Sequence, residues 1–290
     1  MKQIYQLNTA MIHFDQDRFA QAASSFLTRF GLPGTMTCNP EALREIFRAF
    51  SHLPYENLSK ILRLPETGKV SPPLFRTPEE VLEGYLADRL GGTCFSLTQC
   101  LCSLLSWCGF EAHRVFGDMR HGRNIHCAVV VCLGKEKYLC DAGYLLPEPV
   151  LMTPGGKSVL KSALYTYLLE ADSADSEAYN LYTSSHRDEL KWRYRIRDRT
   201  ASDREFEYRW RLTFKAPMMR QIVLTRSLEE GQVYIHQHHL RLNLPQGKRN
   251  LNIRSSMTEK IEELFGIHPA ILEKALIRIE QGEREQVRLT

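Results

Sequence analysis

The feature that most constrains this chain is a cysteine at the first turn of an apolar helix. Two glycines, Gly91 and Gly92, end one helical segment, so Cys94 falls at the start of the next. The unpaired N–H groups of a helix N-terminus favour a thiolate, which is the nucleophilic form of cysteine, and they can hold a developing oxyanion. The pattern predicts a thiol suited to acyl transfer. The apolar residues that define the helix at helical spacing are Leu97, Leu101, Leu104, Leu105 and Cys108.

The segments around this helix are helical before it and β-rich after it. Hydrophobic spacing, Gly stops and a capping box at Thr77–Glu80 predict helices over residues 18–30, 41–50 and 77–89, with a Pro-rich loop over 64–78. After Gly109 the pattern predicts strands over residues 112–116, 126–133, 138–141 and 232–243, then helices over 258–266 and 270–279. This order indicates an α+β chain.

Aromatic residues alternate with charged residues in two later segments. The alternation over residues 190–197 and 206–214 predicts a hairpin with one aromatic face and one basic face. Because Glu207 and neighbouring acids can pair with the arginines, the basic face is interpreted as a solvated sheet surface, not as a nucleic-acid ribbon.

The composition of the chain narrows its class. It has 290 residues, of which 43% are hydrophobic and 25% charged, which excludes disordered chains and disulfide-stabilised mini-proteins. Thirty-eight basic against 34 acidic residues give a net charge of +4, too mild for a dedicated nucleic-acid binder. Eight scattered cysteines favour a reducing compartment, and no export signal or membrane-spanning run is present, so we expect a cytoplasmic protein.

A histidine and an aspartate can complete a triad with the cysteine. His126 is predicted to open one strand and Asp141 to close the adjoining antiparallel strand. In this arrangement His126 is the base and Asp141 orients its imidazole. Papain-like and transglutaminase-like cores use the same chain order of Cys, His and Asp on a helix and two strands. Taken singly, each residue also has an ordinary structural interpretation, since most cysteines pack in cores and an Asp before Ala-Gly commonly forms a turn.

Four short segments together resemble one enzyme family, the arylamine N-acetyltransferases. They are residues 53–58 (Leu-Pro-Tyr-Glu-Asn-Leu), 91–95 (Gly-Gly-Thr-Cys-Phe), 125–126 (Ile-His) and 138–144 (Tyr-Leu-Cys-Asp-Ala-Gly-Tyr). By this resemblance the nucleophile, base and orienting carboxylate are Cys94, His126 and Asp141. The substrate-binding residues that it implies are Tyr55, Gly92, Thr93, Phe95 and Ile125.

The resemblance also implies a fold and a reaction. The expected fold is an N-terminal helical bundle (1–90), a central β-barrel domain beginning with the nucleophile helix (91–200) and a C-terminal α/β lid (201–290), around a papain-like or transglutaminase-like Cys-His-Asp core. The expected reaction is a ping-pong transfer from an acyl-CoA, usually acetyl-CoA, through an acyl-cysteine to a small aromatic amine or hydrazine. No tightly bound cofactor, metal, nucleic acid or membrane partner is expected, and the oligomeric state is left open.

The chain departs from the family pattern close to the nucleophile. Leu90 replaces the motif arginine, and Ser96, Thr98 and Leu145 replace other common residues. We hypothesise that Arg89 or another nearby cation takes the place of the missing arginine as the partner of Glu56.

Three alternative functions fit the same residues. An amide synthase fed by a carrier protein would share the fold, a hydrolytic or transglutaminase-like enzyme would release the acyl group to water or lysine, and a non-catalytic homologue would only bind. The acceptor amine and the length of the acyl chain also stay open.

Two other patterns are interpreted as structural. Gly156-Lys157-Ser158 lacks the glycine spacing of a phosphate-binding loop, so it is expected to form a turn. His236 and His238 share a strand face but have no third ligand in the sequence pattern, which disfavours a metal site.

Overall fold

The computed structural model describes residues 15–34, 36–65, 73–185 and 189–289, the last seven of these by their backbone only. Five helices precede the main sheet: α1 (Gln16–Arg29), α2 (Pro40–Phe50), α3 (Leu58–Ile61), α4 (Pro78–Asp88) and α5 (Cys94–Trp107). Side-chain caps explain where several begin. Asp15 accepts from two first-turn N–H groups of α1, Asn39 accepts from Ala42 N in α2, and the predicted capping box opens α4 at Thr77.

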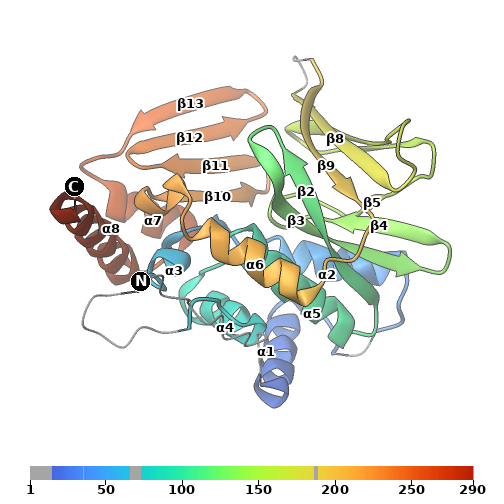
Figure 1. Cartoon of the computed structure of the whole chain (residues 1–290), viewed down its shortest axis with the longest axis horizontal. Helices are drawn as coiled ribbons and strands as arrows, with labels where there is room; N and C mark the ends of the chain where they lie inside the picture. Colours follow the sequence, from blue (N-terminus) through green and yellow to red (C-terminus); the bar gives the residue numbers. More distant parts are fainter. Residues whose placement is uncertain (1–14, 35, 66–72, 186–188, 290) are drawn as a thin grey trace, which may run out of the picture.

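An eight-stranded antiparallel sheet forms the central part of the molecule. Its spatial order is β5-β4-β3-β2-β9-β8-β7-β6, and it curves until its edge strands β5 and β6 come near each other, as a nearly closed barrel. Figure 1 shows this sheet on the right, with α5 beneath it. The strands are β2 (Glu111–Met119), β3 (Gly122–Leu133), β4 (Glu136–Cys140), β5 (Val150–Leu151), β6 (Lys157–Lys161), β7 (Tyr165–Ala171), β8 (Ala178–Ser185) and β9 (Lys191–Arg197).

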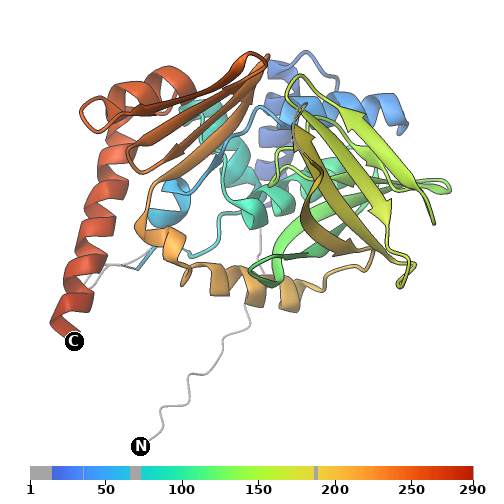
Figure 2. The ribbon, with the colours of Figure 1, turned by 90° about the horizontal axis from the view of Figure 1, so that it is seen from above.

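A second sheet and two helices form the part opposite the barrel. Its order is β1-β10-β11-β12-β13, so a strand from the N-terminal third pairs with strands from the last third. Figure 2 shows the two sheets facing each other across the molecule, with the C-terminal helix along the outer edge of the smaller sheet. The elements are β1 (Tyr55–Glu56), β10 (Val223–Leu228), β11 (Gly231–His236), β12 (His239–Leu244), β13 (Gly247–Asn252), α7 (Met257–Phe265) and α8 (Pro269–Leu289), preceded by a short 3-10 helix, η1 (Pro217–Arg220).

The predicted hairpin of residues 190–197 and 206–214 is wrong. Residues 191–197 are β9, which pairs with β8 and β2, but Asp203–Thr213 is a helix, α6. Ser202 caps this helix by accepting from Glu205 N at 3.3 Å, and two acids occupy its first turn. Only Phe206 and Trp210, four residues apart, are buried, whereas Tyr208 is 57% exposed. The buried period is therefore helical.

The strand predictions around the triad hold with shifted ends. His126 lies inside β3, four residues after its start, and Asp141 directly follows β4.

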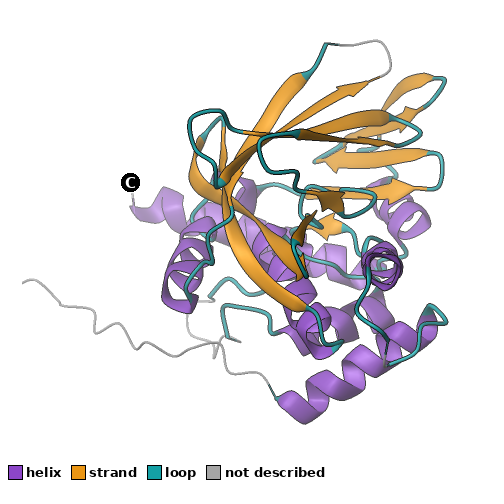
Figure 3. Ribbon diagram, turned by 90° about the vertical axis from the view of Figure 1, so that its right-hand side faces the viewer, coloured by secondary structure: helices purple, strands orange, loops and turns teal. Residues whose placement is uncertain are grey.

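The hydrophobic core shows why the helical and barrel parts stay together, because side chains of α1, α2, α4 and α5 share one buried cluster with the central strands. Figure 3 shows most helices packed below the strands. The expected mixed fold, with helices, a barrel and a lid, is confirmed; the division at residues 90 and 200 stays a prediction.

Within the described residues, no helix is both long and apolar enough to cross a membrane.

Candidate active site

Cys94 is the first residue of α5, and the turn before it is fixed to β1. Glu56 N donates to Gly92 O at 2.9 Å, and Gly92 N donates to Pro54 O at 3.3 Å. Thr93 is the N-cap, with an extended backbone, and its side chain makes no capping hydrogen bond. Cys94 therefore begins the helix in the turn that carries its orphan N–H groups, and backbone hydrogen bonds hold the residues just before it.

His126 and Asp141 form a buried hydrogen-bonded pair. His126 Nε2 lies 2.6 Å from Asp141 Oδ2, and the side chain of Asp141 has no solvent exposure. The other carboxylate oxygen, Oδ1, accepts from Tyr144 N at 2.8 Å. The antiparallel register of β3 and β4, which pairs Val129 with Cys140, brings the two side chains to the same end of the strands. Asp141 thereby fixes the ring of His126.

Cys94 and His126 meet at Gly143. A Cβ atom on Gly143 would lie 2.8 Å from the Cβ atom of Cys94 and 3.3 Å from Cε1 of His126. Any larger residue at this position would push the two side chains apart. His126 lowers the pKa of Cys94 by hydrogen bonding and by its charge, and because Asp141 occupies Nε2, the ring nitrogen left for sulfur is Nδ1. The structure thus brings together the three predicted catalytic residues.

The electrostatics favour a thiolate at Cys94. The hydrogen bond that Cys127 donates lowers the pKa of Cys94 most; burial opposes this, and the hydrogen bond and charge of His126 and the charge of Lys60 lower the pKa further. Burial alone would lower the pKa of His126, but the charge and hydrogen bond of Asp141, together with Cys94, raise it to about 10. A thiolate–imidazolium pair is the resulting form at neutral pH.

This pair gives a measurable pH dependence. Because the pKa of Cys94 is lowered and that of His126 raised, the rate of Cys94 alkylation by iodoacetamide should stay nearly constant between about pH 7 and about pH 9. The alkylation rate of an ordinary thiol would instead rise about tenfold per pH unit below the pKa of that thiol. Peptide mass spectrometry can follow Cys94 alongside Cys38, an exposed cysteine that serves as the internal control. A Cys94 rate that climbs in parallel with Cys38 would contradict the ion pair.

Three residues near the triad were missed by sequence reasoning. Cys127 is fully buried and contacts Cys94, although its place next to His126 on a strand suggests the opposite face. Tyr194 packs its ring 4.8 Å from the ring of His126. Lys60 donates from Nζ to Thr213 Oγ1 at 2.5 Å and lies 4.6 Å from the centre of the Phe214 ring. Its partners lie more than 150 positions away, so no local pattern could have indicated its role.

Burial lowers the pKa of Lys60 to about 8. Lys60 is only 5% exposed to solvent. The nearby thiols of Cys94 and Cys127 are the groups that favour the charged form of its amine. The ammonium therefore depends on a negative neighbour, and the Cys94 thiolate is such a neighbour.

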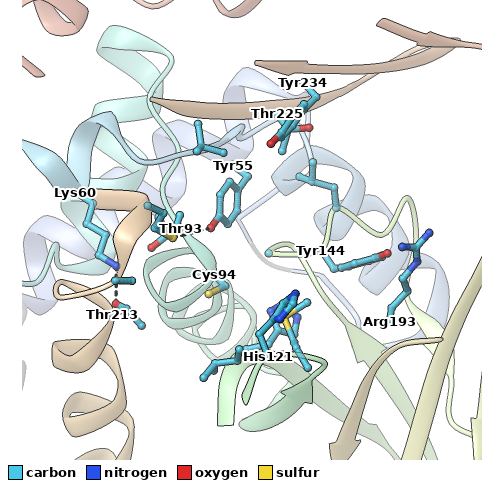
Figure 4. Close-up of a pocket in the computed structure, with 18 of the residues that line it drawn as sticks. Tyr55, Lys60, Thr93, Cys94, His121, Tyr144, Arg193, Thr213, Thr225 and Tyr234 are labelled. Atoms are coloured by element: carbon cyan, nitrogen blue, oxygen red, sulfur yellow. Dashed lines mark hydrogen bonds between the residues drawn. The ribbon is translucent and has the colours of Figure 1, made fainter. Parts of the chain in front are cut away.

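The thiol opens into a cavity of about 800 Å³. Figure 4 shows Cys94 between Lys60 on one side and Tyr144 with Arg193 on the other. Of the predicted substrate-binding residues, Tyr55, Thr93 and Ile125 line the cavity. Gly92 and Phe95 do not: Gly92 belongs to the turn bonded to β1, and the Phe95 ring is buried against Phe206 at 5.1 Å. The substrate roles of these five residues stay predictions.

The cation that faces Glu56 is Arg76, not Arg89. Arg76 Nη1 lies 4.0 Å from Glu56 Oε1 and donates to Gly91 O at 2.6 Å, and both side chains are nearly or fully buried. Arg89 instead caps α4 in the left-handed conformation, with its guanidinium 5.4 Å from the centre of the Tyr85 ring. The prediction that Arg89 pairs with Glu56 is therefore wrong, and the alternative of another nearby cation is correct.

The structure gives the surroundings of the four residues that depart from the family pattern. Leu90 is buried in the apolar cluster beneath the smaller sheet, and Leu145 lines the cavity with φ 58°. Ser96 donates to Thr93 O at 3.0 Å, and Thr98 donates to Cys127 O at 3.0 Å. Thr98 thereby ties α5 to the strand that carries His126.

The two remaining sequence patterns lie in the barrel and in the smaller sheet. His236 Nε2 lies 2.6 Å from Gln221 Oε1, and the part of the chain that the structure describes holds no cluster of three His, Cys, Asp or Glu residues able to bind a metal. Lys157 begins β6 directly after the turn at Gly156 and leads into no helix.

Comparison with known proteins agrees with this geometry. A model of the N-acetyltransferase family matches residues 40–271, which is most of the chain. The chain belongs to the arylamine N-acetyltransferase family. It is a diverged member of this family of enzymes, and no curated protein matches it significantly.

Several solved arylamine N-acetyltransferases share the fold. The enzyme from Mycobacterium abscessus is 17% identical with a TM-score of 0.73, covering 92% of this chain and 99% of that one. The enzyme from Mycobacterium marinum, solved in complex with CoA, is 17% identical with a TM-score of 0.73, over 89% and 98% of the two chains. The enzyme from Bacillus cereus, described as having a unique Cys-His-Glu triad, is 21% identical with a TM-score of 0.69, covering 86% of this chain and 98% of that one.

Proposed function

We propose that this protein transfers an acyl group from an acyl-CoA, most simply acetyl-CoA, to an aromatic amine or hydrazine through an acyl-Cys94 intermediate. The observation that carries the proposal is that Cys94 and His126 both lie against Gly143, with His126 hydrogen-bonded to Asp141, at the wall of a cavity of about 800 Å³. A cavity of this size can hold an aromatic ring beside the thiol. The CoA complex of the Mycobacterium marinum relative supports the choice of donor.

The first half-reaction acylates the enzyme. The Cys94 thiolate attacks the thioester carbonyl, forms a new C–S bond and breaks the C–S bond to CoA, which leaves as a thiolate and takes a proton from the His126 imidazolium. The first-turn N–H groups of α5 are placed to stabilise the oxyanion formed on the way. Because donor and product are both thioesters, this step is close to balanced in free energy.

The second half-reaction transfers the acyl group to nitrogen. The amine attacks the Cys94 thioester, neutral His126 accepts the proton that nitrogen loses, and the Cys94 thiolate leaves. The imidazolium–thiolate pair is then restored without any outside reactant. Asp141 holds the ring in place and stabilises its charge through both steps.

Lys60 assists by its charge. Its ammonium lowers the pKa of Cys94, and Lys60 lines the same cavity as the thiol. The role of Lys60 is electrostatic: Thr213 holds its Nζ atom, and the Phe214 ring fixes its direction.

The direct test is the acyl-enzyme itself. Incubation with acetyl-CoA in the absence of amine should add one acetyl group to Cys94, detected by intact-protein and peptide mass spectrometry, and addition of an aromatic amine should remove it as the acetylated amine. The Cys94→Ala protein should acquire no adduct, whereas Cys102→Ala, a change on the same helix away from the thiol, should acylate normally. Acetylation of amine by Cys94→Ala would refute the mechanism.

The same experiment separates the alternative functions. An enzyme that takes its acyl chain from a carrier protein would give no adduct with acetyl-CoA but would be acylated by an acyl carrier protein. A hydrolase would lose the acetyl group rapidly without amine, and a non-catalytic homologue would give no adduct with either donor.

All eight cysteines are free, so we expect the protein to work in the cytoplasm, where thiols stay reduced.

A further inference from the structure

A second thiol lies beside the nucleophile and takes no part in acyl transfer. Cys127 follows His126 on β3 and is fully buried. It belongs to an aromatic cluster around Phe95 and Trp210, against which Cys94 also packs. Hydrogen bonding to Cys127 is the largest cause that lowers the pKa of Cys94. The two sulfur atoms therefore lie within hydrogen-bonding reach of each other.

A contact between α5 and β3 holds the two thiols together. Cys94 is the first residue of α5, and Thr98, one turn later, donates from Oγ1 to Cys127 O at 3.0 Å. Thr98 is itself 1% exposed, so water does not compete for this bond. The start of the helix is thus fixed against the strand at Cys127. Two thiols within hydrogen-bonding reach need only a small side-chain rotation to approach the ~2 Å length of an S–S bond.

The two thiols differ in access and in ionisation. Cys94 lines the cavity of about 800 Å³ and has a lowered pKa, so an oxidant that enters the cavity meets a thiolate. Cys127 has no solvent-exposed surface, and burial, together with its hydrogen bond to Cys94, raises its pKa well above the usual value. Cys94 is therefore oxidised first, while Cys127 stays a protonated thiol next to it.

We propose that Cys94 and Cys127 form an oxidant-sensitive disulfide site, in which Cys127 resolves the nucleophile after hydrogen peroxide has oxidised it. In the first step the Cys94 thiolate attacks the peroxide. An S–O bond forms, the O–O bond breaks, and the released hydroxide takes the proton of the His126 imidazolium to become water.

The second step forms the disulfide. The Cys127 sulfur attacks the sulfur of the Cys94 sulfenic acid, the S–O bond breaks, and the leaving hydroxyl group takes the Cys127 proton as water. The two cysteines together lose two electrons, which reduce one molecule of peroxide to water. No further oxidant or reductant is needed.

The disulfide inactivates the protein reversibly. Cys94 in a disulfide cannot attack a thioester, and a dithiol reductant returns both thiols by exchange. Without a neighbouring thiol, further peroxide would carry the Cys94 sulfenic acid to sulfinic acid, which thiols do not reduce. Cys127 thereby protects the nucleophile from irreversible loss.

Mass spectrometry of the peroxide-treated protein, alkylated and digested without reductant, tests the linkage. The wild-type protein should lose about 2 Da and give a peptide pair that joins Cys94 to Cys127, and dithiothreitol should restore nearly all of its activity. Cys127→Ala should instead gain about 32 Da or more at Cys94 and stay inactive after dithiothreitol. Cys127→Ser, which keeps the size and a hydrogen-bonding group, should behave like Cys127→Ala.

Cys132→Ala is the matched control. Cys132 lies on the same strand, five residues beyond Cys127, and shares with it the tryptic peptide of residues 124–135. The control variant leaves Cys127 as the only cysteine of that peptide and should still form the link. Chymotrypsin, which cuts after Phe95, separates Cys94 from the other cysteines of its own tryptic peptide.

Two results would overturn the inference. One is a wild-type protein in which Cys94 gains oxygen while no peptide joins it to Cys127. The other is equal recovery of activity by dithiothreitol in the wild type and in both Cys127 variants, which would mean that Cys127 does not resolve the oxidised thiol.

The link forms without acyl-CoA, so its failure is distinguishable from failure of the proposed acyl transfer. Prior incubation with acetyl-CoA should protect Cys94 from peroxide, because the sulfur of a thioester is no longer a thiolate. A disulfide that forms equally fast with and without acetyl-CoA would contradict the proposed acylation and leave the disulfide site established.

Discussion

Replacing Asp141 by Asn should lower kcat by about 10³- to 10⁴-fold while leaving the protein folded. The carboxylate supplies both the charge and the hydrogen bond that hold the pKa of His126 at about 10. Without them burial dominates and lowers that pKa, so the imidazolium is lost and Cys94 keeps its proton. Single-turnover acetylation of Cys94, followed by quenched-flow mass spectrometry, measures the effect on the first half-reaction directly.

The stability of the Asp141→Asn protein should change little, because an amide is less costly to bury than a carboxylate and can still accept the bond from Tyr144 N. Asp175→Asn, which removes a carboxylate on the barrel surface, is the matched control and should keep full activity. Asp141→Glu keeps the charge and should regain part of the lost rate. A kcat for Asp141→Asn above about one tenth of the wild-type value would mean that Asp141 does not orient the base.

The part of the site that was predictable from sequence depends on local signals. Gly91 and Gly92 before an apolar period place Cys94 at a helix start, and the two antiparallel strands place His126 and Asp141 close together. The aromatic segment of residues 206–214 was mistaken for a strand because buried residues four apart satisfy a period of two as well as a helical period. The cap at Ser202 and the acids after it were the local signals for the helix.

The electrostatic partners of the site were not predictable, since they come from distant parts of the chain. Lys60 is held by α6, and Arg193 is bound by the neighbouring strand β8. Arginines at alternate positions of β9 look equivalent in sequence, yet the surface acids pair with two of them and the third faces the cavity. The register of β8 and β9 makes this distinction: a β-bulge between Leu181 and Tyr182 leaves Arg193 without a register partner.

Arg76→Met should destabilise the protein by about 3–5 kcal/mol, because it leaves the fully buried Glu56 without its cation. Arg76 also donates to Gly91 O and to Glu80 O, both at 2.6 Å, so it links the start of α4 to the turn before Cys94. Gly84 makes room for it: a Cβ atom there would lie 2.5 Å from Arg76 Nη2. A glycine inside α4, which costs helix stability, thus has a packing reason. Urea unfolding followed by circular dichroism measures the loss.

Arg89→Met is the control for this change, and it should cost less than about 1 kcal/mol, because Arg89 lies over the face of Tyr85 and beside Gly266 and makes no ion pair in the described residues. Combining Arg76→Met with Glu56→Gln removes the unpaired charge and should recover part of the lost stability. Equal losses for Arg76→Met and Arg89→Met, or no recovery in the double variant, would show that the buried pair does not replace the missing motif arginine at Leu90. A selective loss for Arg76→Met means that this chain holds its nucleophile turn with a cation from a different element, which is how Leu90 can be apolar and pack beneath the smaller sheet.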